Sequence, residues 1–182
     1  MKGRDNQTES LENKEESFMA KVIIDIRDYG KITVELDAEA APITVENFLE
    51  LAGEGFYDGL TFHRIIAGFM IQGGDPRGNG TGGSGKNIKG EFAQNGVDNP
   101  LMHKRGVISM ARSAAPNSAS SQFFICHEDS PWLDGQYAAF GCVTDGIEVV
   151  DQICTNVRPI DRNGTVLTAD QPVIDSITVV GE

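Results

Sequence analysis

Arg64 is the residue of this sequence best placed for electrostatic chemistry. It lies in the stretch from Phe62 to Gln72, among large apolar residues and just before a glycine-rich loop. A guanidinium in such surroundings must either reach water or act at a partly dry surface, where its charge is screened less. Since an ordinary surface arginine is the commoner case, the function of Arg64 depends on what the other residues contribute.

Histidines, cysteines and serines offer no competing catalytic arrangement. His63 is next to Arg64 in an alternating strand, so we expect it on the opposite face, as a structural histidine. His103 and His127 lack the spacing of metal ligands, and we predict no metal site. The sequence has neither a nucleophile elbow nor a paired Cys/His signature. Hydrolase chemistry therefore has little support.

The glycine-rich loop contains two patterns that bind phosphate in other proteins. Residues 78–83 match G-x-G-x-x-G, and residues 80–86 match G-x-x-x-x-G-K. Both patterns need a following helix, whose N-terminus supplies amides and a positive dipole end to the phosphate. Here Asn87 replaces the Ser or Thr that would hold Mg²⁺, and residues 88–92 have no helical period. We expect the loop to let backbone pass close to a bound extended chain instead of binding a nucleotide.

Short strands dominate the elements that must position Arg64. Two alternating apolar runs, residues 22–26 and 32–36, flank a short turn and predict an antiparallel hairpin. Pro42 and Thr44 introduce a helix that ends near Gly53, with Thr44 as the expected N-cap. Further strands are expected at residues 60–66, 69–73, 106–111, 121–126, 138–143 and 174–180, with a second helix at 147–154. This pattern predicts a mainly β protein built as a closed or nearly closed antiparallel β-barrel.

Length and charge limit the organisation and the partners of the chain. The 182 residues favour a single folded domain, residues 18–182, preceded by a flexible acidic tail, residues 1–17. A net charge of −12 provides no basic surface for nucleic acid or for an anionic membrane. The first residues lack the apolar region of a signal peptide. Three widely spaced cysteines suit a reducing compartment, so we expect the cytoplasm.

Several motifs, in order and at compatible separations, carry a specific resemblance. The first is Phe-His-Arg-Ile-Ile-Ala-Gly-Phe-Met-Ile-Gln-Gly-Gly-Asp at residues 62–75. The others are Asn-Gly-Thr-Gly-Gly at 79–83, Ser-Gln-Phe-Phe-Ile at 121–125, Trp-Leu-Asp-Gly at 132–135 and Phe-Gly at 140–141. Together they closely resemble the cyclophilin family of peptidyl-prolyl cis-trans isomerases, in the form of a bacterial-like single-domain member. The match covers residues 18–182.

The resemblance implies a closed eight-stranded antiparallel β-barrel capped by two α-helices. It also implies an enzyme that catalyses rotation about X-Pro peptide bonds and assists protein folding, without a covalent step or a cofactor. In this family Arg64 matches the catalytic arginine, Gln72 the amide that bonds substrate backbone, and Phe69 a wall of the proline pocket. The substrate-binding positions carried over in the same way are Met70, Gly80, Ala111, Arg112, Gln122, Phe124, Trp132, Leu133 and Tyr137.

These positions have separate implied roles. Met70, Phe124 and Leu133 complete the proline pocket, and Gly80, Ala111, Arg112 and Gln122 form the neighbouring groove for the residues before proline. Trp132 matches a rim indole associated with cyclosporin binding. Two departures bear on that groove and on cyclosporin affinity. Tyr137 stands where eukaryotic members commonly have histidine. Arg112 stands where many members have asparagine, in a segment one residue longer.

The implied partners are proline-containing polypeptides and cyclosporin-type cyclic peptides, bound by a monomer. A competing interpretation is a proline-peptide binding module or chaperone without turnover. Each site residue taken alone is more often an ordinary core or surface residue. The combination of Arg64, Phe69, Gln72 and Phe124 favours the enzyme.

Overall fold

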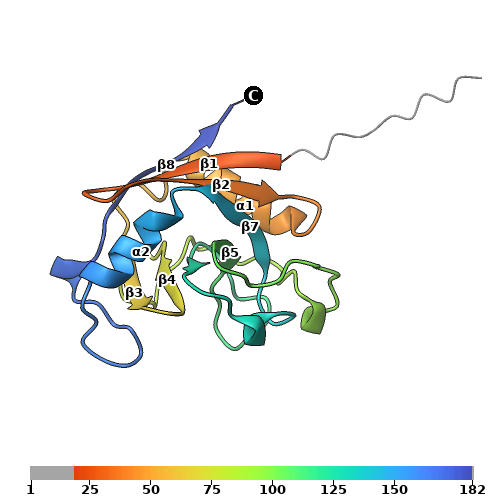
Figure 1. The fold of residues 1–182 in the computed structure, drawn as a ribbon. Coiled ribbons are helices and arrows are strands. Elements are labelled where there is room, and N and C mark those ends of the chain that lie inside the picture. Colours follow the sequence, from red (N-terminus) through yellow and green to blue (C-terminus); the bar gives the residue numbers. More distant parts are fainter. Residues whose placement is uncertain (1–18, 182) are drawn as a thin grey trace, which may run out of the picture.

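An eight-stranded antiparallel sheet forms the body of the molecule (Figure 1). The computed structural model describes residues 19–181, so the tail predicted at residues 1–17 and both ends of the predicted domain lie outside the described residues. In chain order the strands are β1 Met19–Ile26, β2 Gly30–Asp37, β3 Phe62–Ile66, β4 Met70–Gly73, β5 Val107–Met110, β6 Phe123–Cys126, β7 Ala139–Asp145 and β8 Ile174–Val180. Their order in the sheet is β3-β4-β6-β5-β7-β2-β1-β8.

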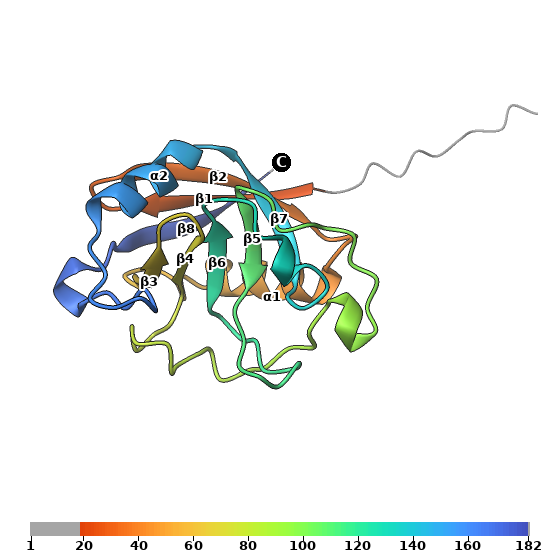
Figure 2. The same cartoon turned by 60° about the horizontal axis from the view of Figure 1, so that its bottom comes forward.

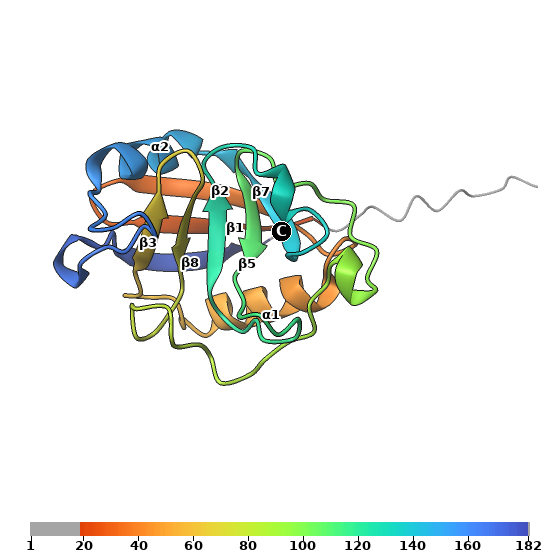
Figure 3. The ribbon, with the colours of Figure 1, turned by 90° about the horizontal axis from the view of Figure 1, so that it is seen from below.

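Two α-helices, α1 Pro42–Gly53 and α2 Ile147–Asn156, lie at opposite ends of the sheet (Figure 3). β3, β4, β6 and β5 run side by side, and β1, β2 and β8 cross behind them (Figure 2). Three short 3₁₀ helices, η1 Ala93–Asn95, η2 Pro131–Leu133 and η3 Thr168–Asp170, lie in the connections. None of the helices between residues 19 and 181 is long and apolar enough to cross a membrane.

The predicted hairpin is confirmed as β1 and β2, which pair from Met19 with Asp37 to Ile26 with Gly30. Its alternation has a direct physical cause. Every second side chain of β1 faces the core, and Val22, Ile24 and Ile26 are at most 1% exposed, while the residues between them are exposed or half-buried. The period of two therefore gives the strand one buried face.

The closed barrel that the sequence predicted is confirmed only in part. The sheet has two end strands, β3 and β8, and no continuous ladder joins them within the described residues. They meet at one isolated bridge, Thr61 with Val173, just before each strand. The backbone N–H of Phe62 donates to Pro172, and that of Ile174 donates to Leu60. The structure is therefore an open sheet. Its end strands β3 and β8 are brought close only by the hydrogen bonds between the segments that precede them.

Helix α1 begins differently from the prediction. Its N-cap is Ala41, so the expected N-cap, Thr44, already lies inside the first turn and is buried. The backbone N–H and the hydroxyl of Thr44 both donate to Oε1 of Glu91, at 2.6 and 2.7 Å. The carboxylate of Glu91 thus accepts from a backbone N–H of the first helical turn, as an N-cap side chain would do. It also places a negative charge at the positive end of the helix.

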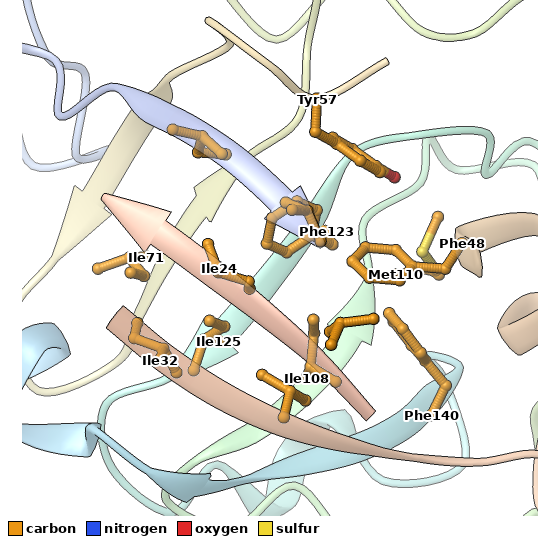
Figure 4. Packing of buried hydrophobic residues seen from close by; sticks show 14 of the residues in the cluster. Ile24, Ile32, Phe48, Tyr57, Ile71, Ile108, Met110, Phe123, Ile125 and Phe140 are labelled. Carbon is orange, nitrogen blue, oxygen red and sulfur yellow. The ribbon is translucent and has the colours of Figure 1, made fainter. Parts of the chain in front are cut away.

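Aromatic side chains fill the space enclosed by the sheet and α1 (Figure 4). Phe48 of α1 lies between Tyr57, Phe123 and Phe140, with ring centroids 5.2 to 5.5 Å apart. The hydroxyl of the fully buried Tyr57 donates to the backbone oxygen of Ser121 at 2.8 Å. Such pairs add specific edge-to-face contacts to the apolar area that they bury, so α1 and β6 are held in a fixed relation.

Strand β6 is apolar on both faces, and this feature creates the site. All four of its residues are buried, so neither face of the strand is exposed to water. Phe123 and Ile125 belong to the enclosed core, whereas Phe124 and Cys126 belong to a second apolar cluster on the other face. Met70 of β4 packs in this second cluster, which therefore lies outside the enclosed core. The parity expected from the sequence for Phe123 and Phe124 is confirmed.

Candidate active site

A cavity of about 130 Å³ lies over the second apolar cluster, and we call it the aromatic cavity. Met70 and Phe124 form its floor and are at most 5% exposed, while Arg64 and Gln72 stand at its polar side. Its lining residues are Arg64, Phe69, Met70, Gln72, Ala111, Arg112, Phe124, Leu133 and Tyr137. The structure thus gathers residues from β3, β4, β6, η2 and three connecting segments around one apolar space.

Arg64 is held at the edge of this cavity by neutral groups. Its Nε donates to the backbone oxygen of Asn163 at 2.7 Å and its Nη2 to Oδ1 of the same residue at 3.3 Å. Its Nη1 donates to Oε1 of Gln72 at 3.2 Å. Among residues 19–181 no Asp or Glu oxygen lies within 4.0 Å of the guanidinium. The position of the cation is fixed while its charge is not neutralised.

The expected opposite orientation of His63 is wrong. The β3–β4 register shifts between Phe62 and Arg64, so His63 is the extra residue of a β-bulge. Because a bulge interrupts alternation, His63 and Arg64 both line a wider cavity of about 540 Å³ beside β3. His63 is 5% exposed and its Nδ1 has no hydrogen-bond partner among the described residues. Burial lowers the pKa of His63, and the nearby Asp75 charge opposes this effect.

Two glutamine amides extend the hydrogen bonds of Arg64 across the outer face. Nε2 of Gln72 donates to Oε1 of Gln122 at 3.0 Å, and Nε2 of Gln122 donates to the backbone oxygen of Gly82 at 2.8 Å. The chain from Arg64 to Gly82 has a single direction, which fixes the orientation of both amides. Each amide nitrogen keeps a second N–H that these bonds do not use, so Gln72 can still donate to a ligand.

A second cavity, of about 230 Å³, adjoins the aromatic cavity, and we call it the serine cavity. Gln72, Ala111 and Arg112 line both cavities, so the two spaces share a ridge. The other lining residues are Gly80, Thr81, Gly82, Ser113, Ser118, Ser120 and Gln122. An extended chain that fills one cavity can therefore place a neighbouring residue in the other.

The glycine-rich loop is organised by Asp75, which is 1% exposed. Its carboxylate accepts from the backbone N–H of Arg77 at 2.8 Å, of Asn79 at 3.2 Å and of Gly80 at 2.6 Å. Burial alone would raise the pKa of Asp75, but these bonds and one from Gly82 outweigh it and lower the pKa. The loop is wrapped around a buried anion, and no helix follows it before residue 93. The segment at residues 88–92 is not helical, as its sequence predicted.

Arg112 is fixed on the shared ridge. Its Cζ lies 4.8 Å from the ring centroid of Phe92 and 4.6 Å from that of Tyr137, so the guanidinium is sandwiched between the two rings. Its Nε and Nη2 both donate to the backbone oxygen of Gln136, at 3.1 and 2.6 Å. Its Nη1 donates to the backbone oxygen of Ser113 at 2.9 Å. These contacts hold Tyr137 at the wall of the aromatic cavity.

Comparison with known proteins identifies this arrangement. The family model described as cyclophilin type peptidyl-prolyl cis-trans isomerase/CLD matches residues 21–179. The chain belongs to this family. A peptidyl-prolyl cis-trans isomerase of Helicobacter pylori is 48% identical over 147 residues, covering 79% of this chain and 87% of that protein. Peptidyl-prolyl cis-trans isomerase B of Bacillus subtilis is 54% identical over 123 residues, covering 68% and 82%.

Solved structures agree with the family. The crystal structure of a Cryptosporidium parvum cyclophilin type peptidyl-prolyl cis-trans isomerase, obtained in the presence of the dipeptide Ala-Pro, matches with a TM-score of 0.78. It is 34% identical in sequence, and the match covers 89% of this chain and 99% of that chain. The cyclophilin family assignment thus extends over nearly the whole described fold.

The positions implied by the family resemblance converge, with one exception. Gly80 and Gln122 line the serine cavity, and the others line the aromatic cavity. Trp132 lines neither of them. It is 58% exposed, and its ring lies 5.6 Å from that of Phe69. Trp132 therefore stands at the rim, where the resemblance to cyclophilins had placed it.

Sequence reasoning missed two residues that organise the site. Asn163 accepts two of the three hydrogen bonds of Arg64, although no motif of the sequence includes it. Phe92 was not expected near the site, yet it forms one side of the Arg112 sandwich. Both are distant in sequence from the residues that they contact, and no local pattern reports such a contact.

Among residues 19–181 no group of three or more His, Cys, Asp or Glu side chains could hold a metal ion.

Proposed function

We propose that the protein catalyses rotation about X-Pro peptide bonds without covalent chemistry, with the proline ring in the aromatic cavity and Arg64 as the catalytic residue. The observation that carries this proposal is the fixed, unneutralised guanidinium beside an apolar space. Rotation breaks amide resonance, and the proline nitrogen regains a lone pair in the twisted state. A guanidinium aimed at that nitrogen stabilises the twisted amide more than the planar one.

The magnitudes are compatible with this role. The barrier to rotation is ~18–20 kcal/mol, and uncatalysed exchange takes about 10–100 s. An acceleration of about 10⁵-fold needs about 7 kcal/mol of stabilisation that exists only in the transition state. By analogy with one preorganised oxyanion donor, a single contact from Arg64 contributes roughly 3–4 kcal/mol. Desolvation of the amide and fixation of the chain must supply the rest.

The amide of the bound X-Pro bond is desolvated by the apolar walls of the cavity, which are Phe69, Met70, Phe124 and Leu133. The twisted amide is less polar than the planar one, so an apolar enclosure favours it. Gln72 provides the fixation, because its spare N–H can donate to a backbone oxygen of the bound chain. One side of the X-Pro bond is then held while the other rotates. The solved cyclophilin crystallised with Ala-Pro supports proline-containing peptides as ligands here.

An exchange assay on a short proline peptide tests this proposal. The rate of cis–trans exchange is measured by NMR line broadening or by coupling to a protease that cuts the trans form. We expect Arg64→Ala to lower kcat/KM about 10²–10³-fold, as for loss of one preorganised donor. Arg158→Ala, at an exposed arginine away from both cavities, is the matched control. Activity of Arg64→Ala within about threefold of wild type contradicts the central role of Arg64.

The alternative, a binding module without turnover, is separated by the same assay. Such a module would bind the peptide, as seen in shifted NMR resonances, without accelerating exchange. Arg64 favours the enzyme, because binding an apolar ring does not require an unneutralised cation at its edge.

Three further properties of the protein are proposed. Cyclosporin-type cyclic peptides are proposed ligands because Trp132 and Phe69 offer an exposed aromatic rim. Both cavities are lined by one chain, which supports action as a monomer. Cys126, Cys142 and Cys154 are free, which supports a reducing compartment, the cytoplasm. Isothermal titration with cyclosporin, light scattering and localisation of a tagged full-length chain test these points in turn.

A further inference from the structure

The two cavities have an unusual charge for so acidic a protein. The whole chain carries −12, yet no Asp or Glu of the described residues lines either cavity. The charged side chains that do line them are arginines: Arg112 in both, and Arg64 in the aromatic cavity. The binding surface is therefore positive within a negative molecule, a pattern that gives specificity for ligand charge.

Arg112 carries the charge at the ridge between the cavities. No Asp or Glu oxygen among residues 19–181 lies within 4.0 Å of its guanidinium. Backbone oxygens of Gln136, Ser113 and Ala114 accept from its three nitrogens and neutralise no charge. A guanidinium has five N–H groups; Nη1 donates both of its own to Ser113 and Ala114, and Nη2 retains one donor. Arg112 can therefore form a charge-assisted hydrogen bond to a ligand oxygen.

The ring sandwich makes this cation a preorganised one. Phe92 and Tyr137 restrict the guanidinium from both sides, and the Gln136 carbonyl fixes its rotation. A free surface arginine loses side-chain entropy when it pairs with a carboxylate, which is why most exposed pairs contribute little. Arg112 has already lost that entropy in the folded protein. A ligand carboxylate at the ridge should gain more than it would from an ordinary surface pair.

We propose that Arg112 makes the enzyme selective for substrates that carry a carboxylate side chain, Glu or Asp, on one of the two residues preceding the proline. The inference deepens the proposed function, on which it rests, by naming a substrate class for the same site. With proline in the aromatic cavity, the preceding residues reach the shared ridge and the serine cavity, where Arg112 is the charged lining residue. The serine cavity supplies hydroxyls and amides that suit a polar side chain.

The test compares matched peptides on the full-length protein. Exchange rates are measured for Ala-Glu-Pro-Phe, Ala-Gln-Pro-Phe and Ala-Lys-Pro-Phe, and for Glu-Ala-Pro-Phe against Gln-Ala-Pro-Phe. We expect kcat/KM to be about three- to tenfold higher for Glu than for Gln in at least one position, with Lys lowest. This preference should shrink as salt is raised toward about 1 M, because salt screens exposed charges. A Glu placed after the proline, in Ala-Pro-Glu-Phe, should give no such gain over Gln.

Variants assign the preference to one residue. Arg112→Gln should bring the Glu-to-Gln ratio to about one, and Arg112→Lys should keep part of it, since the charge stays but the planar fork is lost. Arg158→Gln, at an exposed arginine outside both cavities, should leave the ratio unchanged. If Arg112→Gln lowers kcat/KM equally for all peptides, Arg112 only positions Tyr137 and the inference is wrong. A preference that survives in Arg112→Gln overturns it as well.

The outcomes separate this inference from the function on which it rests. No turnover of the neutral Ala-Gln-Pro-Phe peptide by the wild type would remove the proposed function itself. Turnover of that peptide with equal rates for Glu, Gln and Lys would remove the charge selectivity alone. Should Arg112→Gln fail to fold, the wild-type series and its salt dependence still decide, because a preference insensitive to salt contradicts an ionic origin.

Discussion

Arg64 and Gln72 face each other across β3 and β4, with Nη1 of the arginine 3.2 Å from Oε1 of the glutamine. The two residues are direct partners in the regular register that continues through Ile65 with Ile71, so their side chains lie on the same face, and the bulge at His63 comes only beyond this pair. Gln72 in turn donates to Gln122 at 3.0 Å, so its oxygen cannot rotate away without breaking a second bond. The guanidinium of Arg64 is thus held by an amide that keeps one N–H outside these bonds.

Replacing Gln72 by Glu tests whether the charge of Arg64 must stay unneutralised. The carboxylate can form an ion pair with Arg64 at the same place, so the fold should keep its stability. We expect kcat/KM for a neutral proline peptide to fall at least about tenfold, because the paired guanidinium has a weaker field at the proline nitrogen. Exchange kinetics and thermal melting on the same preparation check both expectations.

Gln72→Ala is the companion variant. It removes both the bond to Arg64 and the donor to substrate, so it should lower kcat/KM without forming an ion pair. If Gln72→Glu is as active as wild type, neutralisation of Arg64 does not matter and the electrostatic role fails. A double-mutant cycle with Arg64→Lys measures the coupling between the two residues.

The neighbours Phe123 and Phe124 should respond differently to the same change. Phe123 is fully buried in the enclosed core against Phe48, Tyr57 and Phe62, so Phe123→Ala should cost about 3–5 kcal/mol of the free energy of unfolding. Phe124 is 5% exposed in the second cluster, beneath the aromatic cavity. Phe124→Ala should therefore raise KM with a smaller loss of stability. Urea unfolding and exchange kinetics give both values.

The contrast between the two phenylalanines is the informative readout. A loss of stability in Phe124→Ala as large as in Phe123→Ala would make Phe124 a core residue instead of a cavity floor. Phe124→Leu, which keeps apolar volume, should retain more stability and more binding than Phe124→Ala.

Sequence reasoning predicted the strands well because alternation and burial are local properties. β8 at Ile174–Val180 has the predicted bounds, and Phe123 and Phe124 have the predicted opposite faces. It failed where a distant group changes a local rule. Thr44 is not the N-cap because Glu91, far along the chain, supplies the acceptor. His63 does not alternate because the register with β4 contains a bulge.

The candidate site shows the same division. Its residues could be carried over from the family motifs, and all of them except Trp132 line the two cavities. Their hydrogen bonds could not be carried over, because Asn163 and Phe92 reach the site through tertiary contacts. The predicted closed barrel is an open sheet, because the number of strands does not determine whether the end strands β3 and β8 pair along their length.

Asp75 lines neither cavity, but it holds the loop that carries Gly80 into the wall of the serine cavity. Asp75→Asn keeps the shape of the side chain, but one acceptor oxygen becomes an amide donor facing the N–H groups of Asn79 and Gly80. Leaving these buried donors unpaired should cost about 1–3 kcal/mol of the free energy of unfolding. Gly80 lines the serine cavity, so KM should rise as well. Urea unfolding and exchange kinetics test the pair of effects.

Asp98→Asn is a control carboxylate for this variant, since Asp98 is exposed and lines neither cavity. Unchanged stability and unchanged KM in Asp75→Asn would show that the loop holds its shape without the buried anion.

Two buried histidines should make the protein less stable in mild acid. Burial lowers the pKa of His63 and of His103, despite a hydrogen bond from the His103 ring to Asp134 that acts the other way. Below the ordinary histidine pKa of 6.5 the unfolded chain takes up protons that the folded chain resists. The free energy of unfolding is therefore fully retained above about pH 6.5 and decreases as the pH falls toward the folded values, by at most about 1.4 kcal/mol per pH unit for each histidine.

Urea unfolding at several pH values between about 5 and 8 measures this slope. His103→Asn removes one titrating group, so its stability should depend less steeply on pH below about 6.5 than that of the wild type, even if its overall stability is lower. His63→Asn should reduce the slope in the same way. A slope that both variants share with the wild type would assign the acid sensitivity to other groups. A wild-type stability that rises as pH falls from 6.5 would contradict the lowered pKa values themselves.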